Sequence, residues 1–356
     1  SLVTLQELSK YRRGYLKLPI IALTGSNGKT TTKELIHAVL SQKFNTKATI
    51  GNLNNHIGVP LTLLSFNSET EIGIVEMGAN HKKEIAFLCE LAKPDYGYIT
   101  NFGKAHLEGF GGIQGVIEGK SELYQYLSIN NKLAFINLED SIQVQKAADL
   151  KFFSFGIKKE NADVNIIDVK ANPFVEINFS NLIIKSHLIG LYNANNINAA
   201  LTIGKYFGVD DIAIKEGLES YIPENNRSQL LSKGTNQIIL DAYNANPSSM
   251  KVAIENFLQL DNPNKIMILG DMFELGDAST QEHLEVLKLL LDKNEIQCFF
   301  IGSAFYANKT VTTHFHFYET FDSFSEYLKE IKIVNSVVLI KGSRGMALER
   351  TLQFFS

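Results

Sequence analysis

Cysteine is scarce in this sequence, which has only Cys89 and Cys298 among its 356 residues. The two lie far apart and outside any C-x-x-C or Cys/His spacing, so neither a disulfide framework nor a structural zinc site is expected. No apolar stretch reaches the roughly 18 residues of a membrane span, and the first residues lack the order of a signal peptide. We therefore expect a cytoplasmic protein with no membrane insertion.

A strong excess of charge of either sign is also absent. The 34 Lys and Arg residues nearly balance the 38 Asp and Glu residues, which gives a formal net charge of -4 and an isoelectric point near 6.1. This balance gives no sign of a polybasic surface for nucleic acid or of a face that seeks a membrane. The expected partners are therefore small molecules, and we expect a monomer. The sequence also shows no internal repeat and no low-complexity tract.

Short β-rich apolar runs alternate with amphipathic stretches of helical length along most of the chain. This alternation indicates an α/β fold with mostly parallel sheets, and the length favours two domains. Between residues 163 and 187, three β-like runs separated by turn residues predict a small antiparallel part. The polar, proline-containing stretch 223–227 is the best candidate for a domain junction. We predict a P-loop central domain over 1–222 and a Rossmann-like α/β domain over 223–356.

The segment TGSNGKTTTKE (24–34) follows an apolar run and precedes a helical pattern. A strand, a glycine-containing loop and a helix in that order form a phosphate cradle, in which loop N–H groups and the helix start attract an anion. Lys29 would neutralise the β and γ oxygens of ATP, and Thr30 would offer a hydroxyl to Mg²⁺. The first glycine of the usual G-x-x-x-x-G-K-[ST] pattern would fall at Leu23, so this is a shorter variant. The predicted ATP-binding residues here are Gly25, Ser26, Asn27, Gly28, Lys29, Thr30 and Thr31.

Three further polar residues follow or lie near predicted strands in the same half of the chain. Glu76 ends a β-run, where a carboxylate could complete the oxygen shell of a phosphate-bound Mg²⁺. His106 lies in a glycine-rich loop and could be a metal ligand, an acid–base group or a hydrogen-bond partner, the last being favoured when it is considered alone. Lys120 lies in a predicted helix, where a lysine is by default a surface residue.

Asparagines mark two later predicted strand or helix ends. Asn193 and Asn196 open a helix, and their amides could match the edge of adenine or could simply cap the helix. Asp241, Asn244 and Asn246 follow a strand, and the segments LGDMFELG (269–276) and KGSRGMALE (341–349) follow two more. Each could be a well-capped turn, but three polar strand ends on one edge favour one wall of a cleft.

Taken together, these motifs resemble those of the Mur ligases, ATP-dependent amide-bond-forming enzymes of peptidoglycan precursor assembly. The matching segments run in family order from residue 24 to residue 349 and also include GNLNNHIGVPLTLL (51–64), VEMGAN (75–80), ITNFGKAHLEGFGG (99–112) and GLYNANNINAA (190–200). One departure is Tyr192, which stands where a histidine often precedes the adenine asparagine. Another departure lies before the cradle. Family members carry a uridine-nucleotide-binding domain there, whereas only residues 1–23 precede the cradle in this sequence. We therefore expect the central and C-terminal domains alone.

The resemblance implies a role for each candidate residue. Thr30 and Glu76 would hold a first Mg²⁺ and His106 a second, while Lys120 would be carbamylated and support both ions as an anion. For ATP, the resemblance implies Asn193 and Asn196 at adenine, together with Arg227 and Asp241 from the second domain. For the substrates, the predicted residues are Asn52, Asn55, Asn244 and Asn246.

The implied reaction is the joining of D-alanyl-D-alanine to a UDP-N-acetylmuramoyl tripeptide through an acyl phosphate. Two alternatives stay open from the sequence. The chain could be another Mur ligase or a folylpolyglutamate synthetase-like ligase with a different acceptor. It could also be a nucleotide-binding module that has no ligase activity without the missing domain.

Overall fold

Two sheets organise the chain in the computed structural model, which describes residues 1–224 and 226–355. The chain divides into two compact units. The first comprises Ser1–Gly103, Gly109–His187 and Leu191–Ile222, and the second comprises Lys104–Glu108, Leu188–Gly190 and Pro223–Ser356. The main division falls after Ile222, while two short segments from earlier in the chain join the second unit.

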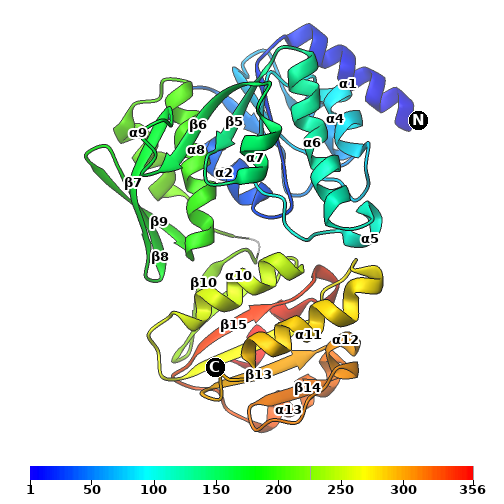
Figure 1. Ribbon diagram of the computed structural model, residues 1–356, viewed down its shortest axis with the longest axis vertical. Helices are drawn as coiled ribbons and strands as arrows, with labels where there is room; N and C mark the ends of the chain where they lie inside the picture. The colour runs from blue at the N-terminus through cyan, green and yellow to red at the C-terminus, as the bar shows by residue number, and fades with distance from the viewer. Residues whose placement is uncertain (225, 356) are drawn as a thin grey trace. The chain divides into compact units, whose positions relative to one another are not determined.

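The first unit is built on a nine-stranded sheet with the order β2-β3-β1-β4-β5-β6-β7-β8-β9 (Figure 1). Neighbouring strands from β2 to β7 are parallel, whereas β7 and β8 are antiparallel. The strands are β1 (Ile20–Thr24), β2 (Thr46–Ala48), β3 (Ile72–Glu76), β4 (Tyr96–Ile99), β5 (Leu133–Asn137), β6 (Lys151–Ile157), β7 (Val164–Ala171), β8 (Phe174–Phe179) and β9 (Leu182–Ile189). The predicted mostly parallel sheet with a small antiparallel part is confirmed.

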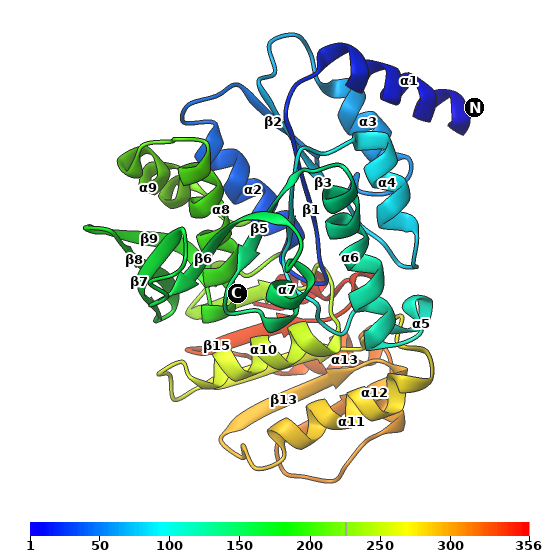
Figure 2. The same cartoon turned by 45° about the horizontal axis from the view of Figure 1, so that its top comes forward.

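Helices cover both faces of this sheet, as Figure 2 shows. Helices α2, α8 and α9 pack together on one face, and α1, α3, α4 and α6 lie on the other. The helices are α1 (Leu2–Leu16), α2 (Lys29–Leu40), α3 (Gly58–Ser65), α4 (Glu84–Ala92), α5 (Leu107–Phe110), α6 (Ile113–Ile129), α7 (Ser141–Lys146), α8 (Ala194–Tyr206) and α9 (Asp211–Ser220), with a 3₁₀ turn at Leu191–Asn193. Because both faces are covered, the central strands are mostly apolar, and every residue of β1 and β3 is buried.

The strand order places three loops side by side. Strand β1 lies between β3 and β4, with Leu23 level with Glu76 and Thr24 level with Ile99. Since parallel strands end at the same edge of a sheet, the loop after β1, the end of β3 and the segment after β4 share that edge. The topology therefore brings together three segments that are far apart in the sequence.

The second unit has a six-stranded sheet in the order β10-β11-β15-β12-β13-β14. Only the β10–β11 pair is antiparallel among the pairings of its described residues. The elements are β10 (Gln229–Lys233), β11 (Asn236–Asp241), α10 (Pro247–Leu258), β12 (Lys265–Gly270), α11 (Ser279–Leu290), β13 (Ile296–Ile301), α12 (Ser303–Ala307), β14 (Phe315–Tyr318), α13 (Phe321–Glu330) and β15 (Val337–Lys341), with 3₁₀ turns at Gly276–Ala278, Arg344–Met346 and Leu348–Phe354. Its strands meet α13 in an apolar core that includes Ile238, Ile268, Phe299, Phe324 and Ile340. The predicted second α/β fold is confirmed.

Candidate functional site

The loop between β1 and α2 has the geometry that the cradle motif predicts. Gly28 is the N-cap of α2 with φ of 78°, and no side chain caps the helix start. An uncapped helix start presents backbone N–H groups and the positive end of the helix dipole, which is a favourable place for an anion. Thr30 and Thr31 lie in the first turn of this helix.

The loop is held by the segment that follows β4, a contact that the sequence did not reveal. Ser26 N–H donates to the carbonyl of Asn101 at 3.0 Å, and Asn27 N–H donates to Asn101 Oδ1 at 3.1 Å. Thr100 Oγ1 donates to the carbonyl of Asn27 at 2.5 Å. A Cβ on Gly25 would stand 2.0 Å from Thr100 Oγ1, so the close approach requires glycine. Thr100 and Asn101 therefore shape the loop. Their position at the end of a strand, just before the glycine-rich stretch, was the only sign in the sequence that they could lie near it.

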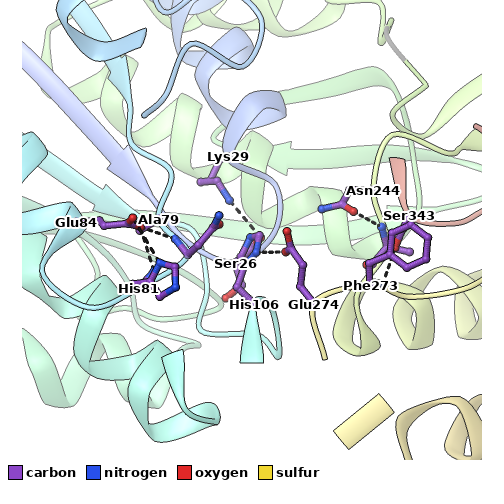
Figure 3. Close-up of polar contacts among 12 residues, drawn as sticks. Ser26, Lys29, Ala79, His81, Glu84, His106, Asn244, Phe273, Glu274 and Ser343 are labelled. Atoms are coloured by element: carbon purple, nitrogen blue, oxygen red, sulfur yellow. Dashed lines mark hydrogen bonds and ion pairs between the residues drawn. The ribbon is translucent and has the colours of Figure 1, made fainter. Parts of the chain in front are cut away.

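The Lys29 side chain folds back over its own loop, as Figure 3 shows. Its Nζ donates to the carbonyl of Gly25 at 2.7 Å and to that of Ser26 at 3.3 Å. The ammonium group is thus held at the mouth of the loop by neutral acceptors. A polyphosphate would offer charged oxygens in their place, and hydrogen bonds to charged acceptors are the stronger ones.

Glu76 is the last residue of β3 and is almost completely buried, at 1% exposure. Its Oε1 accepts a hydrogen bond from Asn54 Nδ2 at 2.8 Å. Its Oε2 is buried and has no hydrogen-bond partner among the described residues. A buried carboxylate oxygen without a partner is costly, so this atom fits a site for a cation. Asn54 was not among the predicted site residues, although its neighbours Asn52 and Asn55 were.

Asn52 and Asn55 differ in their surroundings. Asn55 Oδ1 accepts from the N–H groups of Ile57 and Gly58 at 3.0 and 2.9 Å, so its side chain organises the start of α3. Asn52 is exposed. The predicted contact of both residues with the muramoyl peptide stays a prediction.

Asn193 and Asn196 are both buried, and their side chains contact each other. Asn196 Nδ2 donates to Asn193 Oδ1 at 2.8 Å, and Asn196 Oδ1 accepts from Thr32 Oγ1 at 3.0 Å. A Cβ on Gly28 would stand 2.5 Å from Asn196 Oδ1. Asn196 therefore packs directly against the phosphate loop, while the predicted adenine contact stays a prediction.

Lys120 is fully buried in α6, so the default placement of this lysine on the surface is wrong. Its Nζ donates to the carbonyl of Ala79 at 3.1 Å and lies 5.1 Å from the centre of the Phe110 ring. Burial, followed by the positive charge of Lys29, holds the pKa of Lys120 well below its usual range. The neutral amine is thus favoured, which is the form that reacts with CO₂.

His106 belongs to the second compact unit, where its Nδ1 is paired with the carboxylate of Glu274 (Figure 3). Glu76 belongs to the first unit, and the predictions that Glu76 holds a first Mg²⁺ and His106 a second stay predictions. No cluster of three or more His, Cys, Asp or Glu side chains suited to a metal ion occurs in the described part of the chain.

The three polar strand ends of the second unit do meet at one edge, because β15 lies between β11 and β12. Lys341 Nζ is paired with Asp241 Oδ2 at 2.6 Å and also reaches the carbonyl of Asn244 at 3.3 Å. Ser343 Oγ accepts from Phe273 N–H at 2.9 Å (Figure 3). These contacts join all three segments, and the predicted cleft wall stays a prediction.

Arg227, Asn244 and Asn246 make local contacts in this unit. The guanidinium group of Arg227 stacks 3.6 Å from the centre of the Tyr243 ring. Asn246 caps α10 by accepting from Ser249 N–H at 2.9 Å, and Asn244 Oδ1 accepts from Ala245 N–H at 2.9 Å. Capping therefore accounts for Asn246, and roles at ATP or substrate stay predictions for all three residues.

A pocket of about 390 Å³ lies elsewhere, at the amino ends of β1, β4, β5 and β6. Its charged lining residues are Lys17, Asp95, Lys132 and Lys151, and none of the predicted site residues lines it. Among helices of the described residues, none combines the length and apolar character that crossing a bilayer requires.

Comparison with known proteins places this geometry in context. Residues 23–204 match the family model of the Mur ligase middle domain, and residues 226–344 match that of the Mur ligase glutamate ligase domain. The UDP-N-acetylmuramoyl-tripeptide--D-alanyl-D-alanine ligase of Bacillus subtilis is 34% identical, over 99% of this chain and 79% of its own length.

The solved structures that are similar over 99% of this chain include the following two. One is MurF from Acinetobacter baumannii, with a TM-score of 0.86, 31% identity and 80% of that chain covered. The other is MurF ligase from Thermotoga maritima in complex with ADP, with a TM-score of 0.86, 28% identity and 83% of that chain covered.

Proposed function

The chain belongs to the Mur ligase family, and we propose that it joins D-alanyl-D-alanine to a UDP-N-acetylmuramoyl tripeptide at the expense of ATP. The names of its relatives give the substrates, and the site described above supports the use of ATP. One observation carries the chemistry: a carboxylate oxygen of Glu76 is buried without a partner among the described residues, at the end of the strand that pairs with β1, which leads into the loop before α2. This combination suits a metal-bound polyphosphate.

The expected Mg²⁺ fits the groups present. Glu76 Oε2 and the hydroxyl of Thr30 would hold the first ion, because Mg²⁺ prefers oxygen ligands and is bound in part by phosphate. When bound, the ion neutralises charge on the phosphate oxygens. We extend the proposal to a second Mg²⁺ at His106, as the family resemblance implies.

Lys120 is proposed to be carbamylated. The neutral amine nitrogen attacks the carbon of CO₂, and a new N–C bond forms while one C=O π bond breaks and leaves its electrons on oxygen. The nitrogen then releases one proton to water. The product carries a negative charge where the reacting amine was neutral. Its burial and its lowered pKa support this step, since a protonated ammonium group has no free electron pair.

The reaction needs activation because a carboxylate and an ammonium ion do not form an amide spontaneously. A carboxylate oxygen of the tripeptide attacks the γ-phosphorus, the bond to ADP breaks, and an acyl phosphate forms. The neutral amine of D-alanyl-D-alanine then attacks the acyl carbon, phosphate leaves with the C–O bond electrons, and the nitrogen loses a proton.

The residues of the chain supply binding and charge to these steps. Lys29 and the N–H groups of the loop from Gly25 to Thr31 would hold the β and γ phosphates and disperse the charge of the transferring group. Asn193 and Asn196 would face adenine, with Arg227 and Asp241 reaching ATP from the second unit. The substrates would contact Asn52 and Asn55 in the first unit and Asn244 and Asn246 in the second. A monomer and a cytoplasmic location remain predictions.

The direct test is phosphate release by the purified chain with ATP, Mg²⁺, the UDP-muramoyl tripeptide and D-alanyl-D-alanine. We expect release to require the dipeptide, and the variant Lys29→Met to release none. Replacing the dipeptide with a panel of single amino acids serves as the acceptor control. Release that is driven equally well by a single amino acid would assign another ligase of the superfamily. Nucleotide binding with no release under any condition would support the binding-module alternative.

A further inference from the structure

The loop that runs from Thr49 to Gly58 is fastened to both elements of the proposed nucleotide site. From α2, the buried Lys33 Nζ donates to the carbonyl of Thr49 at 2.5 Å. From β3, Glu76 N–H donates to Thr49 Oγ1 at 3.0 Å. The loop that would hold the muramoyl peptide therefore starts from a residue bonded to the phosphate-loop helix and to the carboxylate-bearing strand.

Asn54, in the middle of this loop, is fixed against the end of β3 by two hydrogen bonds. Its carbonyl accepts from Gly78 N–H at 2.8 Å, and its side-chain amide donates to Glu76 Oε1 at 2.8 Å. A Cβ on Gly78 would stand 2.7 Å from Asn54 Oδ1, so the absence of a side chain there permits the contact. The main chain and the side chain of Asn54 are thus both held.

This contact makes the two oxygens of Glu76 different. The terminal torsion of a glutamate side chain is broad, so a carboxylate with no fixed partner can rotate. With Oε1 bonded to Asn54, the orientation is set and Oε2 is left buried, without a partner in the described part of the chain. A hydrogen bond to one oxygen of a metal-binding carboxylate is a common way to orient the other.

We propose that Asn54 is a positioning residue that orients Glu76 for the nucleotide-bound divalent cation and thereby couples the muramoyl-peptide loop to the nucleotide site. This inference rests on the proposed function, because it takes the Thr49 to Gly58 loop as the substrate loop. Two consequences follow. Loss of the amide weakens the cation's contribution to nucleotide binding, and ordering of the loop by substrate strengthens that contribution. By thermodynamic linkage, the bound nucleotide and cation strengthen substrate binding by the same factor.

The test is calorimetric titration of ADP into the full chain, once in EDTA and once in excess Mg²⁺. The variants are Asn54→Ala and Asn54→Asp, and His56→Ala, at an exposed residue of the same loop, is the matched control. We expect Mg²⁺ to tighten ADP binding in the wild type and in His56→Ala. In both Asn54 variants we expect this enhancement to fall about 10- to 100-fold while the Kd in EDTA changes little. Should Asn54→Asp not fold, Asn54→Ala decides.

Three results would overturn the inference. One is an unchanged Mg²⁺ enhancement in Asn54→Ala. Another is an equal loss of ADP affinity with and without Mg²⁺, which would mean that Asn54 serves only the structure of the loop. The third is a wild-type chain that shows no Mg²⁺ enhancement.

Adding the UDP-muramoyl tripeptide to the same titrations tests the coupling. We expect the tripeptide to tighten ADP binding in the wild type and not in Asn54→Ala. Equal tightening of ADP binding by the tripeptide in both proteins would overturn the coupling. A wild type that shows the Mg²⁺ enhancement but makes no amide with D-alanyl-D-alanine would refute the proposed function and leave the orienting role of Asn54 standing.

Discussion

Replacing Glu76 with glutamine tests whether the unpartnered carboxylate oxygen is kept for a cation. Glutamine has nearly the same shape and can still accept the hydrogen bond from Asn54. It removes a charge from a site that is 1% exposed. In place of Oε2, the variant has an amide NH₂ group with no acceptor.

The two effects can be compared in magnitude. Removing an uncompensated buried charge gains several kcal/mol, and leaving a buried donor unpaired costs about 1–3 kcal/mol. We therefore expect Glu76→Gln to stabilise the protein in EDTA by about 1 kcal/mol. For a domain of 150–250 residues, this raises Tm by about 2–4 °C.

The order of stability should reverse when Mg²⁺ and ADP are present. A ligand at a hundred times its Kd stabilises the folded state by about 2.7 kcal/mol, and the variant should gain much less because it has lost a cation ligand. Thermal unfolding in EDTA and in Mg²⁺ with ADP measures both quantities. The matched control is Glu118→Gln, an exposed carboxylate paired with Lys82, which should change stability by no more than about 0.5 kcal/mol in either buffer.

Two outcomes would refute this reasoning. One is a Glu76→Gln protein that is less stable than the wild type in EDTA, since the carboxylate would then be stabilised by something other than a cation. The other is an equal gain in Tm from Mg²⁺ and ADP in both proteins.

Three further predictions concern other parts of the site. Gly25→Ala should cost about 1–3 kcal/mol of stability and most of the ADP affinity, because its Cβ would stand 2.0 Å from a threonine hydroxyl; Gly14→Ala, with open space around it, is the control, and equal ADP affinity in the two variants would contradict this. Lys120→Ala should lose most phosphate release and Lys120→Glu should keep more. Bicarbonate should restore activity to the CO₂-depleted wild type and leave the activity of Lys120→Glu unchanged. Since the pKa of Lys120 is lowered, this response should begin at a lower pH than an exposed lysine would allow. Lys341→Met should lower the free energy of unfolding, measured in urea, by roughly 3 kcal/mol because it removes the ion-pair partner of Asp241. A double variant with Asp241→Asn should recover most of that loss.

The sequence alone was sufficient for the fold class and the family. The strand–loop–helix order around Lys29 depends on local pattern: an apolar run, glycines that allow unusual backbone angles, and a helix that starts directly after them. The same is true of the alternation that predicts parallel sheets and of the antiparallel part over 163–187. The domain limits 1–222 and 223–356 remain predictions, although the two compact units separate mainly after Ile222.

The environment of each polar side chain could not be determined in this way. Nothing near Lys120 in the sequence marks it as buried, because its burial depends on Ala79 and Phe110, which meet it only in the folded protein. Likewise the contact of Asn54 with Glu76, 22 residues away, is not visible in the sequence, where Asn52 and Asn55 look like equal candidates.

Local pattern thus determined the strand–loop–helix unit that is predicted to bind phosphate, because hydrophobic periodicity and glycine placement act over a few neighbouring residues. Tertiary structure decided which of the nearby polar groups support that site. The order of strands β3, β1 and β4 brings Glu76 and Thr100 to the loop of Lys29, and this pairing of segments far apart in the chain exists only in the folded sheet.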